Sequence, residues 1–392
     1  MNKNIKLSLV TFVTFSGIAS ASVCPDMTIG GAPHPNGGGF VAATASVQNT
    51  VTVGPNASVC ETAIVTGNVT IADIARVQGS ANVSGSATIN GNALVYGNAN
   101  IEGGLITNNA HVYGSARIAD NAIVAQDAHV YGNASLADST VVSSFAEISG
   151  NAELHDASQV FGRAKVLGDA KLFGNSSISD VAIVNGEVSL FGTSKIRGSA
   201  QVTGRVTLSE QADVYGGADI KGTNIFIADS AKVLGNTVLR DSVKIYGLAT
   251  VYGSSTVKDD AEIFGRSLVS GSVLVEKSAQ IFDNAIVNGK TVSGNAMVYG
   301  RSQITEGASA RGSSRIYGEA IISGKALVTG TARVYGQAGV YDDAIVESNG
   351  SVYDVAQVYG RAVISTGGVA HGNASIFGTY KLTTDVSEGN YE

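Results

Sequence analysis

An aliphatic residue returns at every sixth position along nearly the whole chain, starting at Val53, Val59 and Val65 and continuing to Leu382 with three single-residue slips. A repeat of six does not match the helical turn, but it keeps side chains on one face of a β-strand. The position two residues before each aliphatic residue is mostly Ala, so each hexad points one large and one small apolar side chain inward. This pattern predicts a stack of short strands instead of separate globular domains.

The position two residues after the aliphatic residue is Gly in most hexads, and Asp is the commonest alternative. Both residue types accept a positive φ, so we expect a left-handed corner in each hexad. Outward aromatic residues recur at 18-residue spacing, which indicates that three hexads close one triangular coil. The chain therefore predicts an all-β fold with a single three-sided parallel β-helix. With roughly 19 coils at about 4.8 Å each, the rod is expected to be on the order of 90 Å long.

The first residues have the features of an export signal. Lys3 and Lys6 precede an apolar run too short to span a bilayer, and Ala19-Ser20-Ala21 fits a cleavage site. We expect the protein to be secreted and extracellular or at the cell surface, with the periplasm as the other compartment, and to have no transmembrane segment. The predicted division is a signal peptide at 1–21, an irregular N-terminal arm at 22–40, the β-helix at 41–387 and a polar tail at 388–392.

The charged residues are scattered along an acidic chain, whose formal net charge is −7. Because binding to nucleic acid needs clustered basic residues, we expect no nucleic-acid partner. Cys24 and Cys60 are the only two cysteines. An isolated pair in an exported protein indicates a disulfide that ties the arm to the first coils, with two free thiols as the alternative. Lipid attachment at Cys24 is disfavoured, because Val23 stands where a lipobox has a small residue.

The units Ala93-Leu94-Val95-Tyr96-Gly97-Asn98 and Ala332-Arg333-Val334-Tyr335-Gly336-Gln337 resemble the hexapeptide-repeat superfamily. More narrowly, they resemble its branch of bacterial proteins in A-x-V-x-G-N units, which are often labelled as acyltransferases. The resemblance covers about residues 41–387 and implies a left-handed parallel β-helix, whereas periodicity alone leaves the hand open. It also implies that a trimer is one expected form of self-association.

The enzymes of that superfamily usually have a long loop, often a C-terminal helix, and a catalytic His near a coenzyme A cleft. This chain departs from them, because its longest interruption of the repeat is one residue and its tail after the last hexad is short. Export also removes a protein from cytoplasmic acyl-coenzyme A. We therefore expect a binding scaffold more than an enzyme, and we expect no cofactor.

Two sets of polar residues are candidates for chemistry. His111 and His129 are 18 residues apart, so they are expected to lie one coil apart as a general base or a metal pair. The simpler interpretation is that both are surface members of a duplicated His-Val-Tyr-Gly unit. Asp120, Asp138 and Asp156 have the same spacing and are candidates for a Ca²⁺ ladder. They also occupy the corner position, where Asp replaces Gly for backbone reasons.

The most informative surface feature is an aromatic column in the position just after the aliphatic residue. Two interpretations remain open: a ladder that stabilises itself, and a ladder that also binds a polysaccharide or a protein partner. A shorter column of Tyr96, Tyr113 and Tyr131 has the same spacing. The candidate binding residues of the main column are Phe173, Phe191, Tyr246, Phe264, Phe282, Tyr299, Tyr317, Tyr335 and Tyr353.

Three functional hypotheses follow from these observations. The first is a secreted or cell-surface structural and binding scaffold that uses the aromatic column. The second is an acyltransferase that uses His111 or His129. The third is a filament subunit that stacks end to end through its terminal coils. An ice-binding face is disfavoured because Thr is scattered instead of forming regular outward rows.

Overall fold

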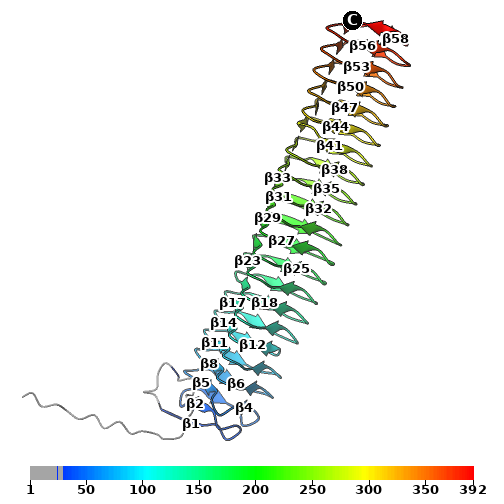
Figure 1. The fold of residues 1–392 in the computed structure, drawn as a ribbon. Helices are drawn as coiled ribbons and strands as arrows, with labels where there is room; N and C mark the ends of the chain where they lie inside the picture. The colour runs from blue at the N-terminus through cyan, green and yellow to red at the C-terminus, as the bar shows by residue number, and fades with distance from the viewer. Residues whose placement is uncertain (1–23, 25–29) are drawn as a thin grey trace, which may run out of the picture.

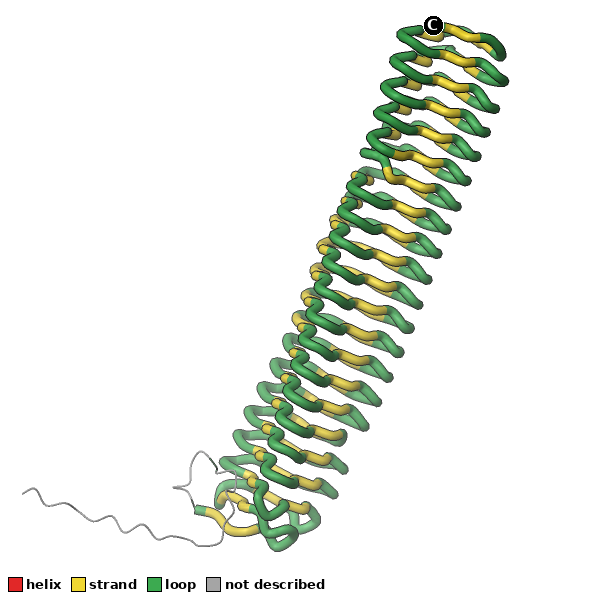
Figure 2. The backbone as a smooth tube through the Cα atoms, viewed as in Figure 1, coloured by secondary structure: helices red, strands yellow, loops and turns green. Residues whose placement is uncertain are grey.

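The computed structural model describes Cys24 and residues 30–392. Figure 1 shows one long rod, with the N-terminal arm at one end and the C-terminus at the other. Short strands alternate with turns in every coil, as Figure 2 shows. The predicted single parallel β-helix is confirmed, with about 20 turns and no helix in the described residues. The predicted signal peptide at 1–21 lies outside the described residues.

The rod has three sides because most strands pair in parallel with the strand three places further along the chain, which lies on the same side of the next coil. The first side runs from β2 (Phe40–Ala42) to β57 (Lys381–Leu382), and the third side runs from β4 (Thr52–Val53) to β59 (Asn390–Tyr391). Strands of these two sides have two to four residues, apart from β29 and β31. The second side, which bears on function, contains β3 (Ser46–Val47), β6 (Ile64–Val65), β9 (Asn82–Val83), β12 (Asn100–Ile101), β15 (Arg117–Ile118), β18 (Ser135–Leu136), β21 (Glu153–Leu154), β24 (Lys171–Leu172), β27 (Val188–Leu190), β29 (Gln201–Leu208), β31 (Asp219–Ile227), β34 (Lys244–Ile245), β37 (Glu262–Ile263), β40 (Gln280–Ile281), β43 (Met297–Val298), β46 (Arg315–Ile316), β49 (Arg333–Val334), β52 (Ser351–Val352), β55 (Val369–Ala370) and β58 (Asp385–Val386).

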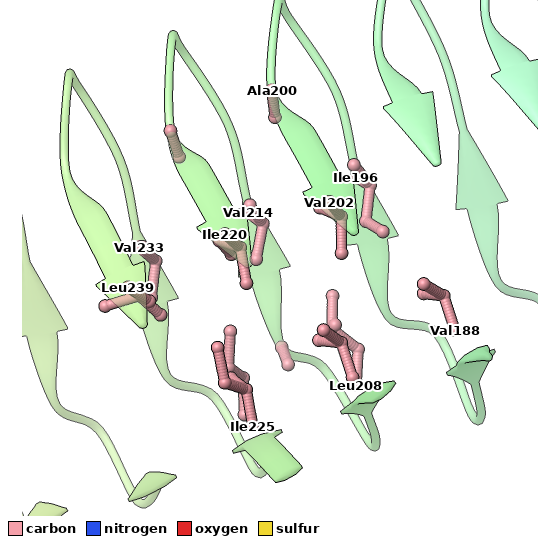
Figure 3. Close-up of a cluster of buried hydrophobic side chains, with 14 of the residues drawn as sticks. Val188, Ile196, Ala200, Val202, Leu208, Val214, Ile220, Ile225, Val233 and Leu239 are labelled. Atoms are coloured by element: carbon pink, nitrogen blue, oxygen red, sulfur yellow. The ribbon is translucent and has the colours of Figure 1, made fainter. Parts of the chain in front are cut away.

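The inward aliphatic and Ala side chains form one continuous core. Val112, Ile118 and Val124 belong to three successive sides of the same coil, and all three side chains are fully buried. Figure 3 shows the same arrangement further along the rod, where Ile196, Val202 and Leu208 point into the shared interior from their strands. The alternation of inward and outward residues in each hexad therefore builds the core as the sequence predicts.

The predicted corners are also present. Gly114 has φ +71°, and a Cβ there would lie 2.9 Å from the backbone nitrogen of Gly132 in the next coil, so both the conformation and the space favour Gly. Every Asp at the equivalent corner position has a positive φ, for example Asp156 at 59°. The corner residues thus turn the chain at each vertex of the triangle.

The one-residue insertion is absorbed without a loop. β29 and β31 each continue from the first side around the corner to the second side, and their pairing shifts register between Gly204 and Val206. Beyond the shift, Leu208 pairs with Ile227, and Ile227 pairs with Ile245 of β34. The second side therefore regains its regular register immediately after the insertion.

Both ends of the rod contain strands outside the predicted 41–387 boundaries. In the arm, β1 (Gly31–Pro33) pairs antiparallel with β2 and extends the first coil, and the predicted disulfide Cys24–Cys60 ties the arm to the coils. At the other end, β59 lies in the segment that we expected to be a polar tail, and the ring of Tyr391 packs near the end of the core. None of the described residues belongs to a helix that could cross a membrane.

Candidate functional site

The aromatic column on the second side forms two runs of stacked rings. Each ring follows the buried aliphatic residue of its strand, and the in-register parallel pairing places it directly over the ring of the preceding coil. Neighbouring ring centroids are 4.7–5.4 Å apart, and the planes differ by 1–11°. The short run contains His155, Phe173 and Phe191, and the long run contains Tyr246, Phe264, Phe282, Tyr299, Tyr317, Tyr335, Tyr353 and His371.

Stacking determines which parts of these rings a ligand can reach. Except for the ring at each end of a run, both faces of every ring contact neighbouring rings, so the second side presents the outer ring edges and the Tyr hydroxyl groups. Tyr hydroxyls are protonated at neutral pH and can donate a hydrogen bond, and burial raises the pKa of Tyr246, Tyr299 and Tyr335 further from neutrality. A sugar ring therefore cannot stack face to face inside a run.

The two runs are separated by a break of two coils. Ser209 and Ala228 occupy the ladder position between Phe191 and Tyr246. Phe191, at the edge of the break, is 41% exposed. Two further exposed apolar side chains belong to the next coils, Phe226 at 39% in the coil of Ala228 and Leu248 at 51% in the coil of Tyr246. We call this break the ladder gap, and it leaves one face of Phe191 and one face of Tyr246 without a stacked aromatic neighbour.

Charged residues on the second side are mostly paired across successive coils. Lys171 binds Glu153 at 2.9 Å, and Lys244 binds Glu262 at 2.7 Å. Such exposed pairs add little to stability. Arg315 lies close enough to Tyr299 to lower the pKa of its hydroxyl slightly, although burial has the larger effect in raising it. The long run is therefore flanked by basic side chains near its Tyr hydroxyls.

His111 and His129 lie on the first side, away from the main column. They belong to β14 (His111–Val112) and β17 (His129–Val130), which pair directly, and their ring centroids are 4.7 Å apart. Burial is the main cause that lowers the pKa of His111, and the neighbouring His129 adds to it. A shallow depression beside His111 includes Arg76. The described residues contain no cluster of three His, Cys, Asp or Glu side chains that could hold a metal ion.

The shorter column of Tyr96, Tyr113 and Tyr131 stands beside this His pair. Its rings stack at 4.7 and 4.9 Å, and Tyr113 meets His129 edge to face. The structure thus brings both candidate His together as the sequence predicts, but on a flat side and within an aromatic cluster. A third stack, Tyr359 on Phe377, was missed by our reading of the sequence, although the same 18-residue spacing could have revealed it.

Asp120, Asp138 and Asp156 use their carboxylates to join successive coils. Each carboxylate accepts a hydrogen bond from the backbone N–H at the same corner of the next coil, at 3.2, 3.0 and 2.8 Å. The other corner Asp residues make the same bond, as Asp73 does to the N–H of Gly91 at 2.9 Å. This geometry supports a backbone role, because one oxygen of each carboxylate is already used within the fold.

The parallel pairing of every third strand, the regular corners and the shared core make the chain a β-solenoid repeat protein. The sequence model of one family, described as the YdcK beta solenoid repeat, matches residues 279–294. This stretch contains β40 and β42 (Thr291–Val292), so it covers about one coil. No curated protein matches the chain.

Proposed function

We propose that the protein is a secreted or cell-surface structural and binding scaffold whose second side binds a polysaccharide. The observation that carries the proposal is the long run from Tyr246 to His371, in which the rings are held in one straight row by the backbone register. Because stacking fixes each ring, the row of hydroxyls is preorganised and loses little entropy on binding. A polymer with a regular repeat suits a surface that repeats once in every coil.

Four consecutive Tyr hydroxyls are central to this proposal, those of Tyr299, Tyr317, Tyr335 and Tyr353. A Tyr hydroxyl both donates and accepts hydrogen bonds, which matches the hydroxyls of a sugar. Arg315 and Arg333 occupy the outward position of the same strands and add five donors each. Protein partners are the other class that such a surface could bind, and they form one outcome of the test below.

The other two hypotheses have less support in the geometry. The His pair lies on a flat side beside a shallow depression, whereas catalysis usually requires a cleft that excludes water. For a filament, the first coil would need an open edge, but β1 pairs antiparallel with β2 and covers that strand. We therefore propose neither acyl transfer nor end-to-end assembly.

The experiment removes the hydroxyls and keeps the rings. A variant with Phe at Tyr299, Tyr317, Tyr335 and Tyr353 retains every stacked contact, so its circular dichroism should match the parent protein. A glycan array and affinity electrophoresis in polysaccharide gels should then show weaker binding. The matched control replaces Tyr341 and Tyr359, which lie on the third side, with Phe.

Equal loss of binding in the control and the test variant would contradict the role of the second side. Binding of the parent protein to a protein receptor, with no glycan bound, would favour the protein-partner alternative and reject the polysaccharide proposal.

A further inference from the structure

In the ladder gap, two small side chains stand where the column otherwise has rings, and we call the space above them, between Phe191 and Tyr246, the recess. Three coil steps of about 4.8 Å separate the rings of Phe191 and Tyr246, so their centres are about 14 Å apart. The two vacant positions between them have the size of two stacked rings. Ser209 and the buried Ala228 form the floor, and Phe226 stands on one flank.

The backbone does not force this gap. Thr207 pairs with Phe226, and Phe226 pairs with Lys244, so the second side is in register across the gap. The insertion that distinguishes these coils is confined to the preceding corner, before Ile225. Rings at positions 209 and 228 would therefore stand in line with the two runs. The small side chains leave two ring faces uncovered that a continuous ladder would cover.

The polar edge of the recess favours hydrogen-bond donors over anions. Glu210 and Asp229 are the corner residues of the two gap coils, and both are exposed. One carboxylate oxygen of Asp229 accepts the N–H of Gly247 at 2.8 Å, which leaves the other oxygen for a ligand. Thr207 adds a hydroxyl on the opposite flank. Two carboxylates repel an acidic ligand but accept hydrogen bonds from sugar hydroxyls or an amino group.

We propose that the ladder gap is the anchoring subsite for a neutral or amino-bearing pyranose ring. The ring lies against the exposed face of Phe191 or Tyr246 with its C–H face and directs its hydroxyls to Glu210 and Asp229. This inference rests on the proposed function, because it takes a polysaccharide as the ligand of the second side. To the proposed function, this inference adds the position on the second side where a sugar ring stacks, and it specifies that the sugar is neutral or carries an amino group.

The test fills the recess with a ring. In Ser209→Phe, the new side chain stacks on Phe191 and extends the short run, so the fold should be retained. Isothermal titration calorimetry with cellohexaose and chitohexaose should show about a tenfold loss of affinity, as expected for one lost ring contact. The control is Ala137→Phe, which adds a ring next to His155 in the same column and leaves the recess open.

A second variant, Phe191→Ala, removes one wall of the recess and should lower affinity by a similar factor even if Ser209→Phe folds poorly. A hexagalacturonate of equal length should bind much more weakly than the neutral hexasaccharides. If the parent protein binds a hexasaccharide and Ser209→Phe binds it equally well, the subsite is wrong and the proposed function stands. If the parent protein binds none of them at millimolar concentration, both proposals fail.

Discussion

Truncation of one ring in the middle of the long run should open the neighbouring coils and leave the rest of the rod unchanged. Tyr317 stacks on Tyr299 at 5.0 Å and on Tyr335 at 4.8 Å, with the planes 5° and 1° apart. A stacked pair contributes about 0.5–1.5 kcal/mol beyond its buried area, and Tyr317→Ala removes two pairs. The half-buried ring also loses roughly 100 Å² of buried area, or about 2 kcal/mol as an upper value. We therefore expect a destabilisation of about 2–4 kcal/mol.

The assay should resolve individual coils, because a solenoid gains its stability from contacts between nearest neighbours. Hydrogen exchange followed by mass spectrometry reports the local opening free energy of each peptide. Peptides that contain β43, β46 and β49 should exchange about 30- to 1000-fold faster in Tyr317→Ala. Peptides around Val112 should keep the parent rate. Tyr317→Phe retains the ring and should change exchange little.

The matched control is Tyr341→Ala. Tyr341 is also half-buried and lies in the equivalent position on the third side, where its ring packs over Gly339. This substitution removes buried area without removing a stacked aromatic pair. If exchange rises no more in Tyr317→Ala than in Tyr341→Ala, the stacked contacts contribute nothing and the argument for a preorganised row is wrong.

Two further perturbations test the corner Asp and the His pair. Asp156→Ala should lower the local stability measured by hydrogen exchange more than Asp156→Gly does. Both variants lose the 2.8 Å bond to Gly174, but only Ala is also destabilised by about 1–2 kcal/mol at a φ of 59°. A larger loss in Asp156→Gly would reject the corner interpretation. The lowered pKa of His111 means that the unfolded chain binds the proton more readily than the folded one, so stability should fall as the pH drops below about 6.5. His111→Gln should flatten this acid-side dependence in the coils around β14, and an unchanged slope would show that His111 is not its source.

Periodicity was sufficient to predict the architecture, because the repeat encodes strand, corner and side in every six residues. Val112, Ile118 and Val124 face one interior, Cys24 is bonded to Cys60, and the aromatic residues at 18-residue spacing stack. These outcomes depend on which residues lie over one another in successive coils, and this register follows directly from the 6-residue and 18-residue spacings of the sequence. The strands β1 and β59 carry no repeat signal, since their pairing depends on the adjacent coil more than on their own residues.

The consequences of stacking could not be predicted from spacing alone. Spacing places Tyr317 near Tyr335 but leaves the orientation of the two rings open. In the structure their planes differ by only 1°, so each ring covers the facing side of the other and a ligand cannot reach it. The same limit applies to Asp156, whose type and position fit both a cation ladder and a corner. Only the direction of its carboxylate, toward the N–H of Gly174, separates the two interpretations.

Since ring faces are covered within each run, recognition of a ring must occur where a run ends, and the four ends differ in character. The short run begins at His155, whose imidazole nitrogen lies 3.6 Å from the Asp138 carboxylate. The long run terminates at His371, whose imidazole nitrogen lies 3.1 Å from the Asp385 carboxylate. The two ends of the column away from the ladder gap are therefore imidazole rings that each lie beside a carboxylate. The inner ends are the carbocyclic rings of Phe191 and Tyr246, which face each other across small residues, so the physical case for stacking on a sugar is strongest at the ladder gap.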